Sequence, residues 1–167
     1  MRSIKQKTTL EKAWRLLETV TPLRSDCGVL CGSRCCQGDA QTGMLLFDGE
    51  ADIYQNDANF QILRQNGREL LVCGGVCARE RRPLSCRIYP LFPLLYERDG
   101  QEYIKAVLDP RGMGSCPLIK EKRPPDRRFC RAVERCGKLL AEDPAQYAIL
   151  QEISGLLLDI IDMGSLL

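Results

Sequence analysis

The sequence predicts an α+β fold: a small antiparallel sheet with cysteine-rich loops beside it, flanked by an N-terminal helix and a C-terminal pair of helices. Two dipeptides typical of tight hairpin turns, Asn66-Gly67 and Asp99-Gly100, each lie between segments of alternating polarity. Apolar residues recur at three- or four-residue steps near both ends of the chain, as in amphipathic helices. The chain has 167 residues, 44% hydrophobic and 28% charged, so we expect residues 1–167 to form a single domain.

The first helix is expected over residues 8–20, with Thr8 or Thr9 as its cap and Thr21-Pro22 at its end. The chain is then rich in Cys, Gly and Ser up to residue 43, and a loop of that length needs something to organise it. The remaining elements are expected as a helical turn within 49–55, a hairpin around Asn66-Gly67, a helical turn at 84–88, a hairpin around Asp99-Gly100, and helices over 126–140 and 145–163. This divides the domain into a cysteine-cluster core, 24–116, and a C-terminal helical hairpin, 126–163.

Charge and hydropathy argue against nucleic acid and membranes as partners. The 24 Lys and Arg nearly balance the 22 Asp and Glu. The locally basic stretch 120–138 is interpreted as a charged helix face, because only Phe129 interleaves its charges. The apolar C-terminal segment is interrupted by Glu152, Asp159 and Asp162, which argues against a spanning helix. The N-terminus lacks the apolar stretch of a secretory signal, so a cytoplasmic location is predicted.

Ten cysteines in a reducing compartment predict metal ligands in preference to disulfides, although disulfides remain the competing interpretation. The chain contains no histidine, which excludes Cys₂His₂ fingers, His-ligated catalytic zinc and Ser–His or Cys–His dyads. Coordination by thiolates alone favours zinc or an iron–sulfur cluster of the [4Fe-4S] type over magnesium or calcium. Cys136 is expected in the core of the last-but-one helix, and Cys130 is ambiguous.

Eight cysteines are the candidate metal ligands. They divide along the sequence into two groups of four, and four thiolates complete a zinc site or a [4Fe-4S] cluster. Whether there is one site or two is left open, because ligands from different loops commonly share a metal. The candidates are Cys27, Cys31, Cys35 and Cys36 in the first group, and Cys73, Cys77, Cys86 and Cys116 in the second.

Arginines surround the second group, at positions 79, 81, 82 and 87. Four thiolates around a divalent ion leave a formal charge of −2, which needs compensation when it is partly buried. We expect the guanidinium of Arg82 or Arg87 to point toward a cysteine cluster or a nearby carbonyl. A solvated basic loop is the simpler interpretation of the same residues. Asp48, Glu50 and Asp52 could form an acid–base group, but a solvated turn is the more ordinary expectation.

The motif CGVLCGSRCCQGD followed by CGGVCARERRPLSCRIYP resembles the YkgJ-like family of cysteine-cluster proteins, which are regarded as zinc- or iron-chelating domains. The resemblance covers about residues 27–93. One departure is the spacing Cys31-Gly-Ser-Arg-Cys35, one residue longer than the family's usual CG-x-CC. The matching residues are Cys27, Cys31, Gly32, Cys35, Cys36, Cys73, Cys77, Arg82, Pro83, Cys86, Arg87 and Pro90.

The resemblance implies metal chelation, with a role in metal handling or electron transfer and no agreed reaction. A related cysteine-rich segment occurs in flagellin lysine methylases, so the alternative is the cysteine-cluster component of an enzyme such as a protein methyltransferase. A thiol redox protein is a further alternative. The expected partner is a metal ion or cluster, and a protein partner is left open.

Overall fold

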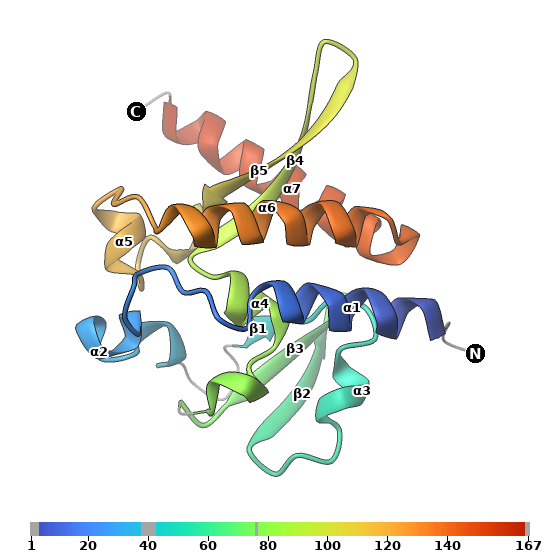
Figure 1. Cartoon of the computed structure of the whole chain (residues 1–167), viewed down its shortest axis with the longest axis vertical. Coiled ribbons are helices and arrows are strands. Elements are labelled where there is room, and N and C mark those ends of the chain that lie inside the picture. Colours follow the sequence, from blue (N-terminus) through green and yellow to red (C-terminus); the bar gives the residue numbers. More distant parts are fainter. Residues whose placement is uncertain (1–3, 38–42, 76, 166–167) are drawn as a thin grey trace.

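The computed structural model describes residues 4–37, 43–75 and 77–165, and within them it has the predicted α+β fold (Figure 1). Helix α1 (Ile4–Leu16) begins the fold, and α6 (Arg127–Ala141) and α7 (Pro144–Ser165) end it. Two antiparallel sheets lie between these helices in the sequence. The main core joins α1, α6 and α7 to the second sheet, through buried residues such as Leu17 and Leu150.

The first helix begins and ends earlier than predicted. It covers Ile4–Leu16, so Thr8 and Thr9 lie inside it and do not cap it, and Val20 lies beyond its end. Lys5, Gln6 and Lys7 favour helix and extend it toward the N-terminus. Of the apolar positions at helical spacing in this segment, Leu10 and Leu17 are almost completely buried, whereas Trp14 and Val20 are half-buried. Ala13 is also completely buried.

The first predicted hairpin is confirmed. Strands β2 (Phe60–Gln65) and β3 (Arg68–Cys73) pair antiparallel, with Gln65 opposite Arg68. Asn66 and Gly67 have φ values of 51° and 75°, the left-handed conformation that a two-residue type I′ turn requires. The short strand β1 (Met44–Leu45) pairs with the other edge of β3, so the sheet order is β1-β3-β2.

The second predicted hairpin is also confirmed. Strands β4 (Leu91–Arg98) and β5 (Gln101–Leu108) are joined through Asp99 and Gly100, whose φ values are 54° and 74°. The first five residues of β4 are buried, and the far end of the hairpin is exposed. Helix α6 packs closely on this sheet, because a Cβ atom on Gly137 would lie 2.5 Å from Cβ of Pro93.

The C-terminal helices occupy the predicted segments. The side chain of Asp126 caps α6 by accepting a hydrogen bond from the backbone N–H of Arg128 (2.8 Å). Apolar residues of α6 that recur at three- or four-residue steps are completely buried, at Phe129, Val133, Cys136 and Leu140. Helical spacing of the apolar residues in 145–163 predicts Leu156 on the buried face of α7, but its side chain is 50% exposed.

The remaining elements are short, and most of them carry or border the cysteines. They are α2 (Cys27–Cys31), η1 (Arg34–Cys36), α3 (Ala51–Tyr54), η2 (Arg79–Arg81), α4 (Leu84–Ile88), η3 (Pro110–Gly112) and α5 (Pro117–Lys120). Helices α2 and α5 lie at the same side of the molecule, beyond the end of α1 (Figure 1). The helical turns expected at 49–55 and 84–88 are thus confirmed as α3 and α4.

No helix in the described ranges combines the length and the apolar character needed to cross a membrane.

Candidate metal centre

The first cysteine segment folds into two short helical turns. Asp26 caps α2 by accepting a hydrogen bond from the backbone N–H of Gly28 (3.0 Å). Gly32 ends α2 in the left-handed conformation, with φ of 63°. The chain then enters η1, which holds Cys35 and Cys36. An irregular loop was expected over 24–43, and this is wrong for 27–36, which forms two helical turns. Residues 38–42 lie outside the described residues.

One set of thiols lies around α2 and the start of α5. Burial raises the pKa of Cys27, and the neighbouring thiolates of Cys31 and Cys116 raise it further. The pKa of Cys35 is raised by a hydrogen bond with Cys36, by burial, and by the charges of Cys27 and Cys31. These effects place Cys31, Cys35 and Cys116 as electrostatic neighbours of Cys27. We call Cys27, Cys31, Cys35 and Cys116 the first thiol set.

A second set forms where the 27–36 segment meets the loop after β3. A Cβ atom on Gly75 would lie 3.5 Å from the carbonyl oxygen of Cys36, so the two segments are in contact there. Burial raises the pKa of Cys86 strongly, and the charges of Cys36, Cys77 and Cys73 add to that rise. Burial also raises the pKa of Cys77, with further contributions from Cys73 and Cys36. We call Cys36, Cys73, Cys77 and Cys86 the second thiol set.

The two sets do not follow the grouping along the sequence. Cys36 is adjacent to Cys35 in the chain but neighbours the thiols after β3, whereas Cys116 joins the thiols of α2. Residues 35 and 36 therefore connect the sets. Within the described ranges, no group of three or more Cys, Asp or Glu side chains has the geometry to hold a metal ion. The thiols of each set are close enough to interact electrostatically but are not gathered as ligands.

Arg82 lies between the two sets. Burial alone would lower the pKa of Arg82, but a hydrogen bond to Cys77 and the charges of Cys77, Asp26 and Cys36 outweigh burial and raise it. Its Nε atom is buried and has no hydrogen-bond partner. A buried donor without an acceptor is costly, and a thiolate or sulfide ligand is an acceptor of the type this position needs. The thiols of the two sets are suitable metal ligands by their chemistry, and the unpartnered N–H of Arg82 is a suitable donor to a metal-bound sulfur.

Arg87 fixes the loop that carries the second thiol set. Its Nε donates to the carbonyl of Arg82 (2.8 Å), and its Nη2 donates to the carbonyl of Glu80 (2.7 Å). Its guanidinium also lies 5.3 Å from the ring centroid of Trp14 in α1, within cation–π range. The expectation that one of the two arginines points to a neighbouring carbonyl is confirmed for Arg87. Their role beside a metal stays a prediction.

Glu50 ties this loop to the core through hydrogen bonds with distant segments. The interpretation as a solvated turn is wrong for Glu50, whose side chain is completely buried. Its carboxylate accepts hydrogen bonds from Nε1 of Trp14 (3.3 Å) and from the backbone N–H groups of Phe47 (3.0 Å) and Leu84. Burial raises the pKa of Glu50 to about 7, although these three hydrogen bonds oppose the rise. Asp52 is exposed and Asp48 is half-buried.

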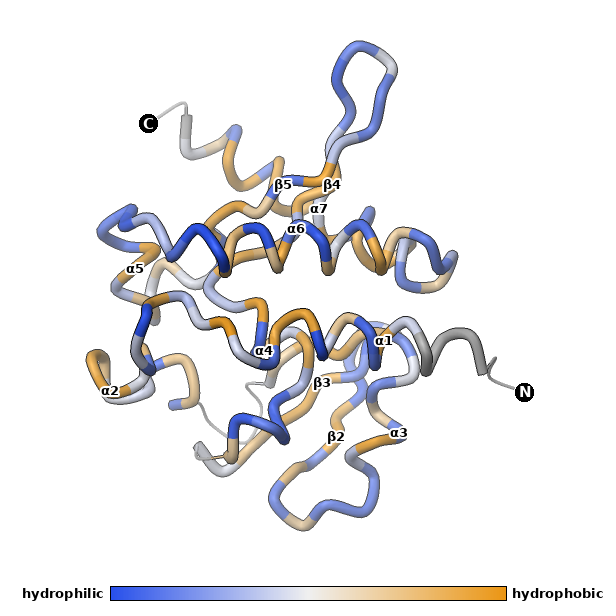
Figure 2. The backbone as a smooth tube through the Cα atoms, in the orientation of Figure 1, coloured by the Kyte–Doolittle hydropathy of each residue, from blue (hydrophilic) through white to orange (hydrophobic). Residues whose placement is uncertain are grey.

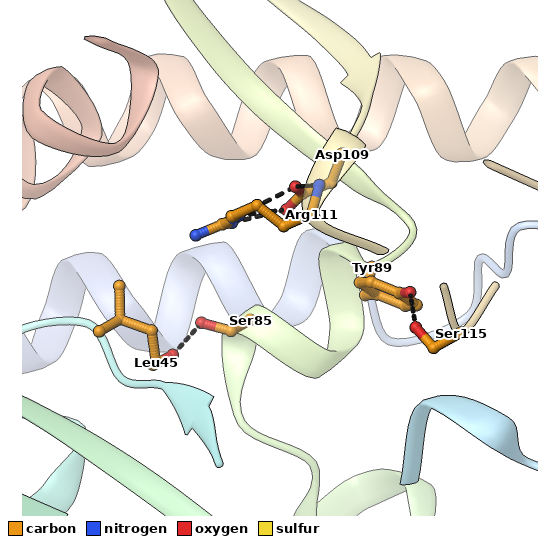
Figure 3. A network of polar contacts seen from close by, with 6 residues as sticks. All are labelled: Leu45, Ser85, Tyr89, Asp109, Arg111 and Ser115. Atoms are coloured by element: carbon orange, nitrogen blue, oxygen red, sulfur yellow. Dashed lines mark hydrogen bonds and ion pairs between the residues drawn. The ribbon is translucent and has the colours of Figure 1, made fainter. Parts of the chain in front are cut away.

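Polar contacts order the segments next to Cys86 and Cys116 (Figure 3). The hydroxyl of Tyr89 lies 3.0 Å from Oγ of Ser115, the residue before Cys116. Asp109 accepts hydrogen bonds from Nε (2.9 Å) and Nη2 (2.6 Å) of Arg111, which orders the turn that leads to Cys116. Ser85 donates to the carbonyl of Leu45 and thereby joins α4 to β1.

Substitution of Gly112 is expected to disturb this region. A Cβ atom there would lie 2.3 Å from the hydroxyl of Tyr89 and 2.5 Å from Cδ1 of Ile119. Gly112→Ala should therefore lower the free energy of unfolding by about 1–3 kcal/mol, the usual cost of overpacking. The measurement is urea unfolding, with Gly114→Ala as the matched control because a Cβ there meets nothing within 4 Å. Equal free energies of unfolding for the two variants would show that the close packing of Gly112 against Tyr89 and Ile119 does not affect stability.

In the reduced, metal-free protein, Cys36 is expected to be the most reactive thiol. A hydrogen bond from Cys35 and the charge of Arg82 lower the pKa of Cys36 to about 6. Its rate of alkylation by iodoacetamide should therefore rise with pH around pH 6, below the range in which ordinary thiols react. Arg82→Gln should raise this pKa and slow the reaction at pH 7, whereas Arg81→Gln should not. Faster alkylation of another cysteine, measured by peptide mass spectrometry, would contradict this assignment.

The last two cysteines lie apart from both sets. Cys136 is completely buried in α6, as the sequence predicted, and burial raises its pKa. Cys130 is half-buried against the main core, and burial, followed by the charge of Glu134, raises its pKa. Neither of them is an electrostatic neighbour of the eight candidate ligands in the described chain.

No family model, curated protein or solved structure matches this chain.

Proposed function

We propose that this chain is a metal-binding protein that holds zinc or iron–sulfur clusters through its clustered cysteine thiolates, with one site at each thiol set. The observation that supports this most strongly is the electrostatic effect of neighbouring thiols within each set. The charge of Cys31 raises the pKa of Cys27, and the charge of Cys73 raises the pKa of Cys77, because like charges repel. A bound cation removes that repulsion and stabilises all the thiolates of a set together.

The donor chemistry restricts the metal. Four thiolates without histidine suit zinc or a [4Fe-4S] cluster and suit magnesium or calcium poorly. Both candidates would leave a formal charge of −2 at each site. The positive charge of Arg82 acts on Cys27 of the first set and on Cys36 and Cys77 of the second. Arg82 and Arg87 would then support the sites from outside the ligand shell, by donating to a sulfur and by fixing the loop.

Metal handling or electron transfer in the cytoplasm is the proposed context, since free thiols and thiolate metal sites persist in a reducing compartment. This context agrees with the resemblance to the YkgJ-like family. The methyltransferase alternative has no support other than that resemblance. A thiol redox function is the second candidate, and a specific observation favours it: Cys36 has a lowered pKa beside the adjacent thiol of Cys35.

Anaerobic purification followed by elemental analysis and a visible spectrum tests the proposal. Iron with inorganic sulfide and a brown colour identifies clusters, whereas stoichiometric zinc without colour identifies thiolate zinc sites. Cys31→Ser should remove the metal of the first thiol set alone, and Cys77→Ser that of the second. Cys130→Ser is the control and should keep both metals. A protein that binds no metal under these conditions, or that loses equal metal in all three variants, would overturn the proposal.

A further inference from the structure

A basic groove lies between α1 and α6, away from the cysteines. Its volume is about 490 Å³. The partly buried side chains of Leu16 and Leu139, which pack against the main core, form its apolar floor. The cations Lys12, Arg15, Arg135 and Lys138 line the groove, and Glu142 is the one acidic residue of its lining.

The four cations of this groove are unneutralised. All of them are exposed, and within the part of the chain that the structure describes none of them has an ion-pair partner. Four positive charges held between two helices over an apolar floor favour an occupant that is both acidic and apolar. A purely polyanionic occupant would leave the leucine floor unused.

The C-terminal end of α7 has that complementary chemistry. Its side chains of Leu156, Ile161 and Met163 are 50%, 38% and 61% exposed. Asp159 and Asp162 are exposed between them, and they have no ion-pair partner in the described ranges. Hydrophobic and hydrophilic stretches alternate along this end of the helix (Figure 2).

No basic side chain within α7 neutralises this end. Residues 144–165 contain neither Lys nor Arg. Acidic side chains near a helix C-terminus are unfavourable, because the helix dipole already places negative charge there. The end of α7 is therefore an acidic and apolar surface that a basic groove would stabilise.

The groove and the end of α7 do not meet within one molecule. The groove is lined by α1 and α6 alone, and α7 ends on the opposite side of α6 from α1 (Figure 1). We propose that the C-terminal end of α7 of one copy of this chain docks in the α1–α6 groove of a second copy. Two such contacts made reciprocally close a dimer. This self-association uses none of the cysteines and is independent of the metal.

Charge reversal tests the proposal, with the mass in solution measured by light scattering. The wild-type protein should associate at low ionic strength and dissociate as salt screens the contact, since the Debye length falls from about 10 Å at 0.1 M to about 3 Å at 1 M. Arg135→Glu with Lys138→Glu in the groove, or Asp159→Lys with Asp162→Lys on α7, should each weaken association by roughly tenfold or more. Arg128→Glu with Arg131→Glu, on the same helix outside the groove, should leave it unchanged.

Mixing the two reversed proteins gives the decisive result. In a mixed dimer, the acidic groove of the first variant meets the basic α7 of the second. The basic groove of the second variant meets the acidic α7 of the first, so association should return in the equimolar mixture. Circular dichroism of each variant checks that it is folded. A wild-type protein that is monomeric at low salt, or a mixture of folded variants that stays monomeric, would overturn the proposal. Displacement of the second copy by an acidic peptide would support the groove assignment, whereas occupation of the groove by an oligonucleotide in a monomeric protein would overturn it.

Discussion

Removing the metal is expected to unfold the cysteine segments locally, while the amides of the long helices α6 and α7 stay protected from exchange. Amide hydrogen exchange in 24–37 and 74–83 should accelerate by roughly a hundredfold or more, because ordering costs about 1–2 kcal/mol per residue and thiolate zinc supplies about 10–16 kcal/mol in small peptides. Apolar burial does not replace the metal in α2, where Val29 and Leu30 are 82% and 67% exposed. The measurement is exchange followed by mass spectrometry before and after chelation.

The limits of the released segments follow from the packing. Leu84, Ile88 and Leu91 are buried in the main core, so α4 and the buried part of β4 should stay protected without metal. Helices α6 and α7 should also stay protected, because their apolar faces pack on each other and on β4. Residues 38–42 and 76 lie outside the described residues. Unchanged protection of 24–37 and 74–83 in protein verified to be metal-free would show that packing alone holds them.

Glu50→Ala is expected to be the most destabilising single substitution near the site. It would leave the N–H groups of Trp14, Phe47 and Leu84 without their buried acceptor. Each unsatisfied donor costs about 1–3 kcal/mol, so the free energy of unfolding should fall by about 3 kcal/mol or more. Glu50→Gln keeps the shape and one acceptor oxygen and should cost less. Asp52→Ala, on the exposed side of the same turn, is the matched control.

The pH dependence of stability gives an independent check on Glu50. Its pKa is raised from 4.5 to about 7, so between these values the folded protein retains a proton that the unfolded chain releases. The contribution of this group therefore makes stability fall as pH rises from about 4.5 to about 7, and adds no further slope above that range. Glu50→Gln should remove that part of the slope. A slope that is identical in wild-type and Glu50→Gln protein would contradict the raised pKa.

The sequence predicted those parts of the fold that local chemistry determines. The turns at Asn66-Gly67 and Asp99-Gly100 were predictable because few other residues adopt positive φ at both positions of a hairpin turn. The buried stripe of α6 followed from its periodicity. The predicted start of α1 was wrong because helix-favouring residues precede the expected cap. The exposure of Leu156 was not predictable because it depends on which other elements pack against α7.

The candidate site was less predictable because its arrangement depends on contacts between distant segments. The sequence identified the eight cysteines as candidates, but the association of Cys36 with Cys86, and of Cys116 with Cys27, appears only after folding. Glu50 looked like part of a solvated turn, since the donors that bury it come from Trp14 and Leu84, 36 and 34 residues away. The cysteine groups and the arginines beside them indicated a site, but nothing in their spacing indicated which thiols would meet.

X-ray absorption at the edge of the metal that co-purifies anaerobically tests the central claim most directly. If the two thiol sets hold metal, the first coordination shell should contain sulfur alone, at about 2.3 Å and with four ligands for zinc. An iron–sulfur cluster would add iron scatterers beyond that sulfur shell. A first shell of oxygen or nitrogen, or a protein without stoichiometric metal whose thiols are paired as disulfides, would contradict the account.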